Sequence, residues 1–341
     1  MDKNKNLPKI SVVMPVYNRA QYLKESIESI LNQTFNDFEF IIVDDQSTDS
    51  SWEIIQEYSD KDKRIITIKN TDEKGCWSAR NFGWNLANGK YLAIMDSDDI
   101  ALPKRLQTQF DFMEQNPDID ICGSWIENFG DKIIIGAYPQ THDEIRDNMF
   151  FGDSIAQPSV MLKKVAFDKF NLKYKNYIAE DYELWSRAIN FLKFYNIQEP
   201  LLLYRSHAEQ IGTQNKTEQD NCADFIRLRN LEYIGLNLSD KDKKIYLSIL
   251  HGEFVPKTKS VLITSVTMLN KILIAGAQHD YGQHFQERIR NSIKDIATSG
   301  IHKKITSLKL YFTIFRKWKI FKTPKANLRY IYHCLRNLLH L

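Results

Sequence analysis

The 341-residue chain has few cysteines, and no two of them lie close together in the sequence. Zinc-binding and redox motifs usually contain a Cys-x-x-Cys pair, and small secreted domains are rich in disulfides. Neither pattern is present, so a zinc knuckle and a disulfide framework are excluded and a reducing compartment is indicated. The four cysteines are Cys76, Cys122, Cys222 and Cys334.

The sequence also lacks a long uninterrupted apolar run. Its first six residues are polar and lead directly into an expected strand, so no signal peptide is predicted. The most apolar stretch, Ser260 to His279, is interrupted by Lys271 and contains several polar residues. We expect a packed helix there rather than a membrane span. These absences predict a cytoplasmic protein.

Acidic residues are missing from the end of the chain. No Asp or Glu follows Asp295, whereas ten of the 46 Lys and Arg lie beyond it. The net charge of +3 therefore conceals an acidic body and a basic tail. Residues 301–341 are expected either to bind an anionic membrane surface as an interfacial helix or to pack on the rest of the chain. The apolar stripe of this helix comprises Leu308, Tyr311, Phe312, Phe315 and Trp318.

Glycine-rich nucleotide motifs are absent as well. The chain contains neither Gly-x-Gly-x-x-Gly nor Gly-x-x-x-x-Gly-Lys, so a dinucleotide or ATP site of the usual kinds is not indicated. Basic residues gather in the tail without a motif for base recognition, and we expect no nucleic-acid partner.

Strand-like and helical patterns alternate through the first hundred residues. This alternation predicts a mostly parallel, doubly wound α/β sheet with helices on both faces. After Pro103 the alternation weakens, which favours a mixed sheet, and from about Glu218 the pattern is helical. Strands are expected at 10–14, 38–43, 65–68, 91–95, 119–125, 132–137, 160–162 and 201–203, and helices at 20–33, 50–58, 76–87 and 103–115.

Polar side chains follow three of the first four strands. These are Pro15–Asn18, Asp44–Asp49 and the tetrad Asp96–Asp99. The carboxyl ends of parallel strands meet at one edge of a sheet, where ligands bind. Three carboxylates there repel one another, so a divalent cation carrying diphosphate oxygens is an expected partner. Ordinary turns and helix caps are the alternative for these acids.

Four motifs in order resemble those of family 2 glycosyltransferases, which have the GT-A fold. They are Pro-Val-Tyr-Asn (15–18), Val-Asp-Asp-x-Ser-Thr-Asp (43–49), Gly-x-x-x-Ala-Arg-Asn (75–81) and Asp-Ser-Asp-Asp (96–99). The likeness continues through Ala179–Trp185 and Tyr204–His207 and covers about residues 9–212. It implies a GT-A fold, a Rossmann-like nucleotide-binding mixed sheet flanked by helices, with a C-terminal helical extension.

The resemblance also implies a domain division. Residues 1–215 would form the catalytic domain, with a nucleotide-binding half at about 1–100 and an acceptor-binding half at 101–215. Residues 216–341 would form the helical, basic C-terminal region.

A nucleotide-sugar site is implied at the ends of the first strands. Asp45 would recognise the uracil or ribose, Tyr17 can offer its ring or hydroxyl, and Arg80 would lie beside the nucleotide. The residues of this site are Pro15, Tyr17, Asp45, Arg80, Asp96 and Ser97.

A metal site is implied by the Asp-x-Asp element. Asp98 would ligate Mn²⁺ or Mg²⁺ on the diphosphate, Asp96 would contact the ribose or the metal shell, and His207 would complete the shell. Asp99 is expected only to orient its neighbours or to cap the turn before Pro103.

Asp181 resembles the general base of the family. Glu180 is an alternative base, and both acids have a plain alternative as helix-start residues favoured by the helix dipole. Gln157, Glu180 and Trp185 are expected on the acceptor side, although Trp185 fits equally well as a core residue at helical spacing.

The resemblance thus predicts an inverting, metal-dependent glycosyltransferase. It would transfer a hexose or N-acetylhexosamine from a UDP-sugar to a hydroxyl of a glycan or glycolipid in bacterial surface polysaccharide or lipooligosaccharide synthesis, at the inner face of the membrane. A sugar-phosphate nucleotidyltransferase is one alternative, but residues 15–19 lack its glycine-rich loop. The other is a non-catalytic, membrane-bound scaffold that binds a nucleotide sugar.

Overall fold

A computed structural model describes residues 7–129, 134–207, 210 and 214–302. The chain divides into two compact units, Met1–Ile226 and Arg227–Leu341. The division falls within helix α9 (Lys216–Tyr233), whose first residue is also the first residue after the expected boundary. The expected interfacial stripe between Leu308 and Trp318 lies outside the described residues.

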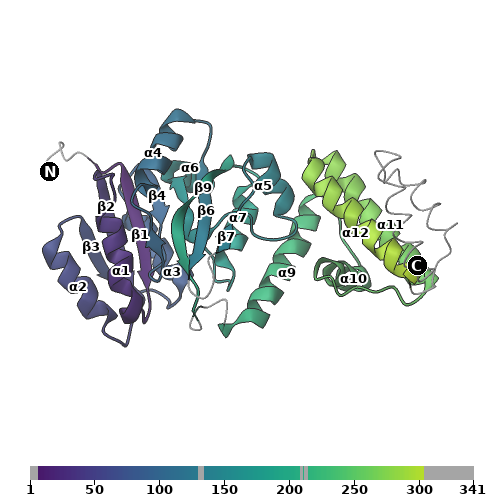
Figure 1. Ribbon diagram of the computed structural model, residues 1–341, viewed down its shortest axis with the longest axis horizontal. Coiled ribbons are helices and arrows are strands. Elements are labelled where there is room, and N and C mark those ends of the chain that lie inside the picture. The colour runs from purple at the N-terminus through teal and green to yellow at the C-terminus, as the bar shows by residue number, and fades with distance from the viewer. Residues whose placement is uncertain (1–6, 130–133, 208–209, 211–213, 303–341) are drawn as a thin grey trace. The chain divides into compact units, whose positions relative to one another are not determined.

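A nine-stranded mixed sheet forms the centre of the first unit (Figure 1). The strand order is β3-β2-β1-β4-β8-β6-β9-β5, and β7 pairs with β6. The strands are β1 (Ile10–Val16), β2 (Phe38–Asp44), β3 (Ile65–Lys69), β4 (Tyr91–Ile94), β5 (Ile100–Ala101), β6 (Ile121–Phe129), β7 (Ile134–Gly136), β8 (Met161–Lys163) and β9 (Phe194–Arg205).

Pairing within the sheet changes from parallel to mixed along the chain. The first four strands are parallel, whereas β8 runs antiparallel to both β4 and β6, and β6 and β9 are parallel. The predicted doubly wound half followed by a mixed half is therefore confirmed. The helices of this unit are α1 (Ala20–Leu31), α2 (Ser51–Lys61), α3 (Cys76–Leu86), α4 (Arg105–Gln115), α5 (His142–Asn148), the short 3₁₀ helix η1 (Gln157–Ser159), α6 (Lys164–Lys169) and α7 (Glu180–Ala188).

Strand β9 is much longer than the three-residue strand expected at 201–203. It has twelve residues and contains Glu199 and Pro200, which interrupt the apolar pattern. Its register with β6 shifts on both sides of Trp125, so a bulge accommodates the proline, which has no backbone N–H to donate. Tertiary pairing thus extends the strand across a sequence that reads as a turn.

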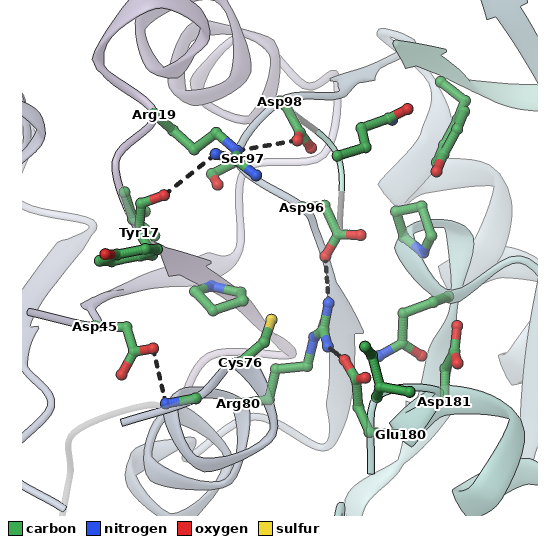
Figure 2. Close-up of a pocket in the computed structure, with 18 of the residues that line it drawn as sticks. Tyr17, Arg19, Asp45, Cys76, Arg80, Asp96, Ser97, Asp98, Glu180 and Asp181 are labelled. Carbon is green, nitrogen blue, oxygen red and sulfur yellow. Dashed lines mark hydrogen bonds and ion pairs between the residues drawn. The ribbon is translucent and has the colours of Figure 1, made fainter. Parts of the chain in front are cut away.

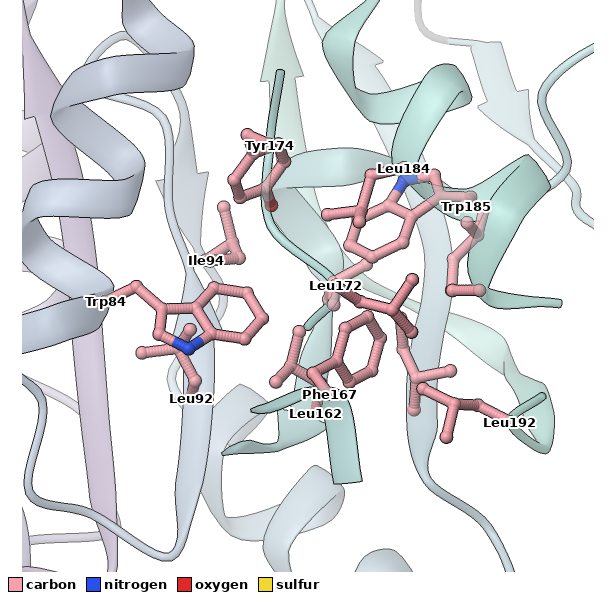
Figure 3. Packing of buried hydrophobic residues seen from close by; sticks show 14 of the residues in the cluster. Trp84, Leu92, Ile94, Leu162, Phe167, Leu172, Tyr174, Leu184, Trp185 and Leu192 are labelled. Carbon is pink, nitrogen blue, oxygen red and sulfur yellow. The ribbon is translucent and has the colours of Figure 1, made fainter. Parts of the chain in front are cut away.

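Helices cover both faces of the sheet. Alternate residues of β1 enter two separate cores, Val13 on one face and Val12 on the other, as the period of two in a strand requires. Helices α1, α2 and α4 contribute to the core around Val12, and α3, α5 and α7 to the core around Val13. Figure 3 shows the core around Val13, in which Phe167 packs edge-on against Trp84 and Trp185 at centroid distances of 5.6 and 6.1 Å.

The second unit contains three further described helices, α10 (Asp240–Leu250), α11 (Lys259–Gln278) and α12 (Gln283–His302). Apolar residues of α11 are buried against α12, and Gly276 leaves room for the ring of Phe285. The expected packed helix at 260–279 is confirmed. Among the described helices, α11 is nevertheless the one whose length and composition would allow a membrane span, and 56% of its apolar window is buried.

Close approach of α3 to the sheet depends on Gly83. A Cβ atom added at this position would lie 2.6 Å from Cγ1 of Val13 and 3.1 Å from Cγ2 of Val43. Both valines are fully buried and β-branched, so they have little freedom to move away.

We expect Gly83→Ala to lower the free energy of unfolding. Alanine gains about 1 kcal/mol in helix propensity, but overpacking a core typically costs about 1–3 kcal/mol, and the rigid valines favour the upper part of that range. Urea denaturation measures the change. Asn85→Ala, at an exposed position of the same helix, is the control and should stay within about 0.5 kcal/mol of the parent. A stabilised Gly83→Ala protein would contradict the close approach.

Candidate active site

A cleft of about 1220 Å³ opens where β1, β2 and β4 end. Residues from both expected halves of the domain line it, which brings segments as distant as residues 15 and 219 to one place. Ten of the twelve expected site residues are among them, and His207 and Trp185 are the two that are not.

Asp45 organises the side of the cleft formed by β2 and α3. Its Oδ2 accepts the backbone N–H of Gly75 at 2.9 Å, and its Oδ1 accepts the side-chain amide of Asn70 at 2.7 Å. Gly75 has φ 149°, and a Cβ there would lie 2.8 Å from Nε1 of Trp77, so the turn requires glycine. Asp45 therefore holds the turn that begins α3 (Figure 2).

Tyr17 is half-exposed in the same region of the cleft. The Nζ atom of Lys74 lies 3.9 Å from the centre of its ring. An aromatic face and a cation lie together at this point, which suits a planar base next to a phosphate. The adjoining Asp49 accepts the backbone N–H groups of Ala20 and Ser51, so it joins the starts of α1 and α2. Ser47 accepts the backbone N–H of Asn18 and does not cap α2.

Arg80 lies between two carboxylates from opposite parts of the chain. Its guanidinium donates to Oδ1 of Asp96 at 2.7 Å and to Glu180, and the side chain is 5% exposed (Figure 2). Burial alone would lower the pKa of Arg80, but Cys76, Asp96 and Glu180 together raise it well above its usual value. Arg80 thus stays charged and joins α3 to the end of β4 and the start of α7.

The tetrad divides between different partners. Asp96 binds Arg80, whereas Oδ2 of Asp98 contacts Nε of Arg19 at 3.1 Å and Nε2 of His207 at 3.0 Å. The Asp-x-Asp element therefore does not bring Asp96 and Asp98 onto one partner. Asp98 and His207 meet even though they are 109 positions apart.

Asp99 holds β9 beside the tetrad. It is fully buried, and its Oδ1 accepts the backbone N–H of Arg205 at 3.0 Å. The side chain of Arg205 in turn donates to the backbone oxygen of Asp98 at 2.7 Å. Asp99 therefore orients its neighbours, and it does so by fixing the strand that leads to His207.

The residues suited to a metal ion are Asp98 and His207. Within the described ranges, no group of three or more His, Cys, Asp or Glu is arranged to hold a metal. The carboxylate oxygen suits either Mn²⁺ or Mg²⁺, whereas the imidazole nitrogen suits Mn²⁺ better than Mg²⁺, and Nδ1 of His207 is buried without a partner among the described residues. Two protein ligands fit an ion that is otherwise bound by water and diphosphate oxygens.

Two adjacent acids begin α7, and their environments differ. Glu180 pairs with Arg80, yet burial outweighs that cation and raises its pKa to about 7. Asp181 lines the cleft, and its Oδ1 accepts the backbone N–H of Tyr182 at 2.7 Å. Burial also raises the pKa of Asp181 above its usual value. Asp181 has no direct ion pair among the described residues, so its carboxylate is the one that remains available to a ligand.

Trp185 does not reach the cleft. It is fully buried and packs against Phe167, Tyr174 and Phe194, so the acceptor-side alternative is wrong and the core alternative is correct. Trp185 lies one turn along α7 from Asp181, and its contacts with three buried aromatic rings, rather than the helical spacing, place it in the core. Gln157 does line the cleft, where its amide nitrogen donates to the hydroxyl of Tyr174 at 2.8 Å.

Many further residues line the cleft, and three of them matter most for its chemistry. They are Lys74, Tyr138 and Asp153. Lys74 precedes Gly75 and could have been found from its motif. Tyr138 and Asp153 lie in connections between β7, α5 and η1 and carry no recognisable spacing, so only the fold reveals them.

Comparisons with known proteins agree with this geometry. The model of the family described as Glycosyl transferase family 2 matches residues 11–168. A glycosyltransferase of Methanocaldococcus jannaschii, itself uncharacterized, is 46% identical over 212 residues, which cover 60% of this chain and 72% of the relative. The UDP-Glc:α-D-GlcNAc-diphosphoundecaprenol β-1,3-glucosyltransferase WfaP of Escherichia coli is 32% identical over 246 residues, which cover 71% of this chain and 93% of the relative.

Among solved structures, residues 1–349 of S. aureus TarS in complex with UDP-GlcNAc have a similar fold. The TM-score is 0.58 at 15% identity, and the match covers 91% of each chain. This chain therefore belongs to glycosyltransferase family 2 and has the GT-A fold, with a helical C-terminal region.

We expect Arg80→Ala to be strongly destabilising. Removal of the guanidinium leaves Asp96 and Glu180 without their counter-ion, and breaking a buried pair typically costs about 3–5 kcal/mol. Urea denaturation measures the loss. Lys61→Ala is the control, since its pair with Glu57 is 64% and 52% exposed and a surface pair contributes about 0–1 kcal/mol. Similar losses in the two variants would contradict the buried clamp.

Proposed function

We propose that this glycosyltransferase transfers a hexose or N-acetylhexosamine from a UDP-sugar to a hydroxyl of a glycan or glycolipid acceptor, with inversion. The observation that carries the proposal is one cleft that joins the ends of β1, β2 and β4 to the partly buried carboxylate of Asp181, which has no ion pair among the described residues. The name of the relative WfaP, which gives a GlcNAc-diphosphoundecaprenol acceptor, supports a glycolipid acceptor, and we propose the synthesis of a bacterial surface glycan on this ground.

The nucleotide sugar is proposed to bind along the ends of β1, β2 and β4. Asp45, beside the turn at Gly75, is suited to accept hydrogen bonds from uracil or ribose. Tyr17 is suited to stack on the base, and Lys74 beside it is suited to bind the diphosphate. Arg80 and Asp96 border the sugar end of this path. That TarS was crystallised with UDP-GlcNAc is consistent with a donor of this type.

Asp181 is the proposed general base. A sugar hydroxyl is a poor nucleophile until its proton is being removed, and a carboxylate beside it can accept that proton as the hydroxyl attacks the anomeric carbon. Arg80 holds Glu180, so the neighbouring acid is less available for this role. Attack from the face opposite UDP inverts the anomeric configuration.

Asp98 and His207 would hold a divalent cation. When bound, Mn²⁺ or Mg²⁺ would offset the negative charge of the diphosphate as UDP leaves. Arg19, which contacts Asp98 at 3.1 Å, adds a second positive group at the same place. A sugar-phosphate nucleotidyltransferase would instead bind its phosphates in a glycine-rich loop, and residues 15–19 contain no glycine.

Asp181→Asn should reduce transfer by about 10²–10⁴-fold while leaving UDP-sugar binding intact. The assay incubates the purified protein with a panel of UDP-sugars, Mn²⁺ and truncated glycan acceptors, and identifies the product by mass and NMR. Because burial raises the pKa of Asp181, kcat/KM of the parent should fall as pH decreases through a value above the usual 3.8. The matched control is Asp60→Asn, an exposed position of α2.

Retention of activity by Asp181→Asn would refute the base. Failure of every UDP-sugar would refute the donor, and an α-linked product from an α-linked donor would refute inversion. A scaffold without catalysis predicts that Asp181→Asn has no effect in cells.

Removal of the metal tests the proposed roles of Asp98 and His207. We expect a chelator to abolish transfer and excess Mn²⁺ to restore it. Asp98→Asn and His207→Ala should each weaken Mn²⁺ binding in calorimetric titrations by about tenfold or more, since each removes one proposed ligand. Unchanged Mn²⁺ affinity in both variants would show that the ion binds elsewhere.

A further inference from the structure

Residues 138–157 contribute a group of polar side chains to the cleft that the proposed donor site and base do not use. Tyr138, Asp153 and Gln157 all line it, together with the apolar Ile126 and Ile155. Polar groups beside apolar surface are typical of a small-molecule site, and a pyranose ring presents hydroxyls at its edge and C–H groups on its faces. Contacts with the sheet hold these side chains in place.

Asn196 of β9 holds the two loops that carry Tyr138 and Asp153. It is fully buried, and its side-chain amide donates to the backbone oxygen of Pro139 at 2.7 Å and to that of Ser154 at 2.9 Å. Each accepting residue directly follows one of the two lining residues in sequence. A central strand of the sheet therefore sets the spacing between Tyr138 and Asp153.

Gly123 of β6 makes room for this arrangement. A Cβ added there would lie 2.5 Å from Oδ1 of Asn196 and 2.6 Å from Cγ1 of Ile155. Any larger residue would displace the amide that joins the loops. The site is thus built on the sheet rather than on a loose surface loop.

Asp153 and Gln157 retain hydrogen-bonding capacity toward a ligand. Oδ1 of Asp153 accepts the N–H groups of Ser154 and Ile155 at 2.7 and 3.3 Å, while the residue as a whole is exposed to the cleft. Gln157 is only 4% exposed, and its Oε1 has no hydrogen-bond partner within the described parts of the chain. A buried acceptor without a partner is costly, so a ligand hydroxyl that supplies one would be favoured.

The charges of these groups are coupled to that of Asp181. Desolvation of the carboxyl group within the cleft and the neighbouring Asp181 raise the pKa of Asp153 well above its usual value. The pKa of the Tyr138 hydroxyl is likewise raised by burial and by both aspartates. No basic side chain is bonded to Asp153 among the described residues. Neutral hydroxyls that donate to the carboxylate suit this environment better than an anionic ligand does.

We propose that Asp153, Tyr138 and Gln157 form the subsite that holds the acceptor sugar, by binding a hydroxyl adjacent to the one that Asp181 deprotonates. The inference rests on the proposed function, because it takes a sugar as acceptor and Asp181 as base. The ligand class is a pyranose with neighbouring free hydroxyls. Asp153 thereby helps to determine which hydroxyl reaches the anomeric carbon.

Steady-state kinetics of the full chain test the subsite. The acceptor probe is α-GlcNAc diphosphate on a short alkyl chain, together with its three monodeoxy analogues, which lack the hydroxyl at C3, C4 or C6. Asp153→Asn should raise the acceptor KM by about 10- to 100-fold and leave the donor KM within about twofold. Asp60→Asn, exposed on α2, is the matched control and should change neither constant.

The deoxy analogues identify the hydroxyl that is bound. With the parent enzyme, the analogue that lacks this hydroxyl should show the same rise in acceptor KM that Asp153→Asn shows with the complete acceptor. With Asp153→Asn, the acceptor KM of this analogue should rise little further, because the interaction between the hydroxyl and Asp153 is already absent. If the effects of the substitution and of the missing hydroxyl on KM simply multiply for every analogue, the assignment is overturned.

The pH profile shows whether the base is disturbed in the variant. Asp181 raises the pKa of Asp153, so Asp153 keeps its proton to higher pH than its neighbour does, and its replacement by neutral asparagine should leave the acidic limb of kcat/KM in place. The other groups that face Asp181 are unchanged in the variant, and they are Arg80, Asp96, Tyr138, Tyr174, Glu180, Tyr204 and Cys222.

The outcomes distinguish this inference from the proposed function. Normal transfer by the parent with an unchanged acceptor KM in Asp153→Asn would overturn the subsite alone, and so would a raised acceptor KM that comes with a displaced acidic limb, because the variant would then have disturbed the base. Absence of transfer by the parent with every sugar would overturn the proposed function, and the subsite with it. Equal rises in the acceptor and donor KM would indicate general disruption of the cleft and would also count against the subsite.

Discussion

The charge cluster centred on Arg80 is the interaction on which the rest of the cleft depends. A buried guanidinium is costly unless it is paired, and here two carboxylates from different parts of the chain pair with it. Because Asp96 ends β4 and Glu180 begins α7, one side chain on α3 joins the parallel half of the sheet to the mixed half (Figure 2). The positions of the nucleotide edge and of Asp181 are thereby linked.

A second connection acts in parallel on the other side of the tetrad. Asp99 binds the backbone of β9 at Arg205, and Arg205 binds the backbone of Asp98. The tetrad is therefore held between α3 and β9, with Asp96 facing the first and Asp98 the second. Asp96 and Asp98 each have their own cationic partner, which offsets part of their repulsion. Burial and these two neighbouring carboxylates raise the pKa of Asp99 well above its usual value, which favours its neutral form.

Much of the fold could be predicted because its signals are local. β1 and β2 are mostly apolar because both of their faces are buried, and α1 shows an apolar stripe because only one of its faces is buried. Prediction was incomplete where tertiary contacts override the local pattern. Pro200 interrupts β9 in sequence but is absorbed by a bulge, and Trp185 shares a helix with Asp181 yet faces the opposite environment.

The sequence by itself determined the order of the strands and helices and the motifs at the strand ends, because both depend on residues that are near neighbours along the chain. Only the tertiary structure decided the partners of each charged group. It paired Arg80 with Glu180, joined Asp98 to His207, and placed Tyr138 and Asp153 in the cleft with Asp181. Such contacts join residues tens to more than a hundred positions apart, and no local periodicity records them.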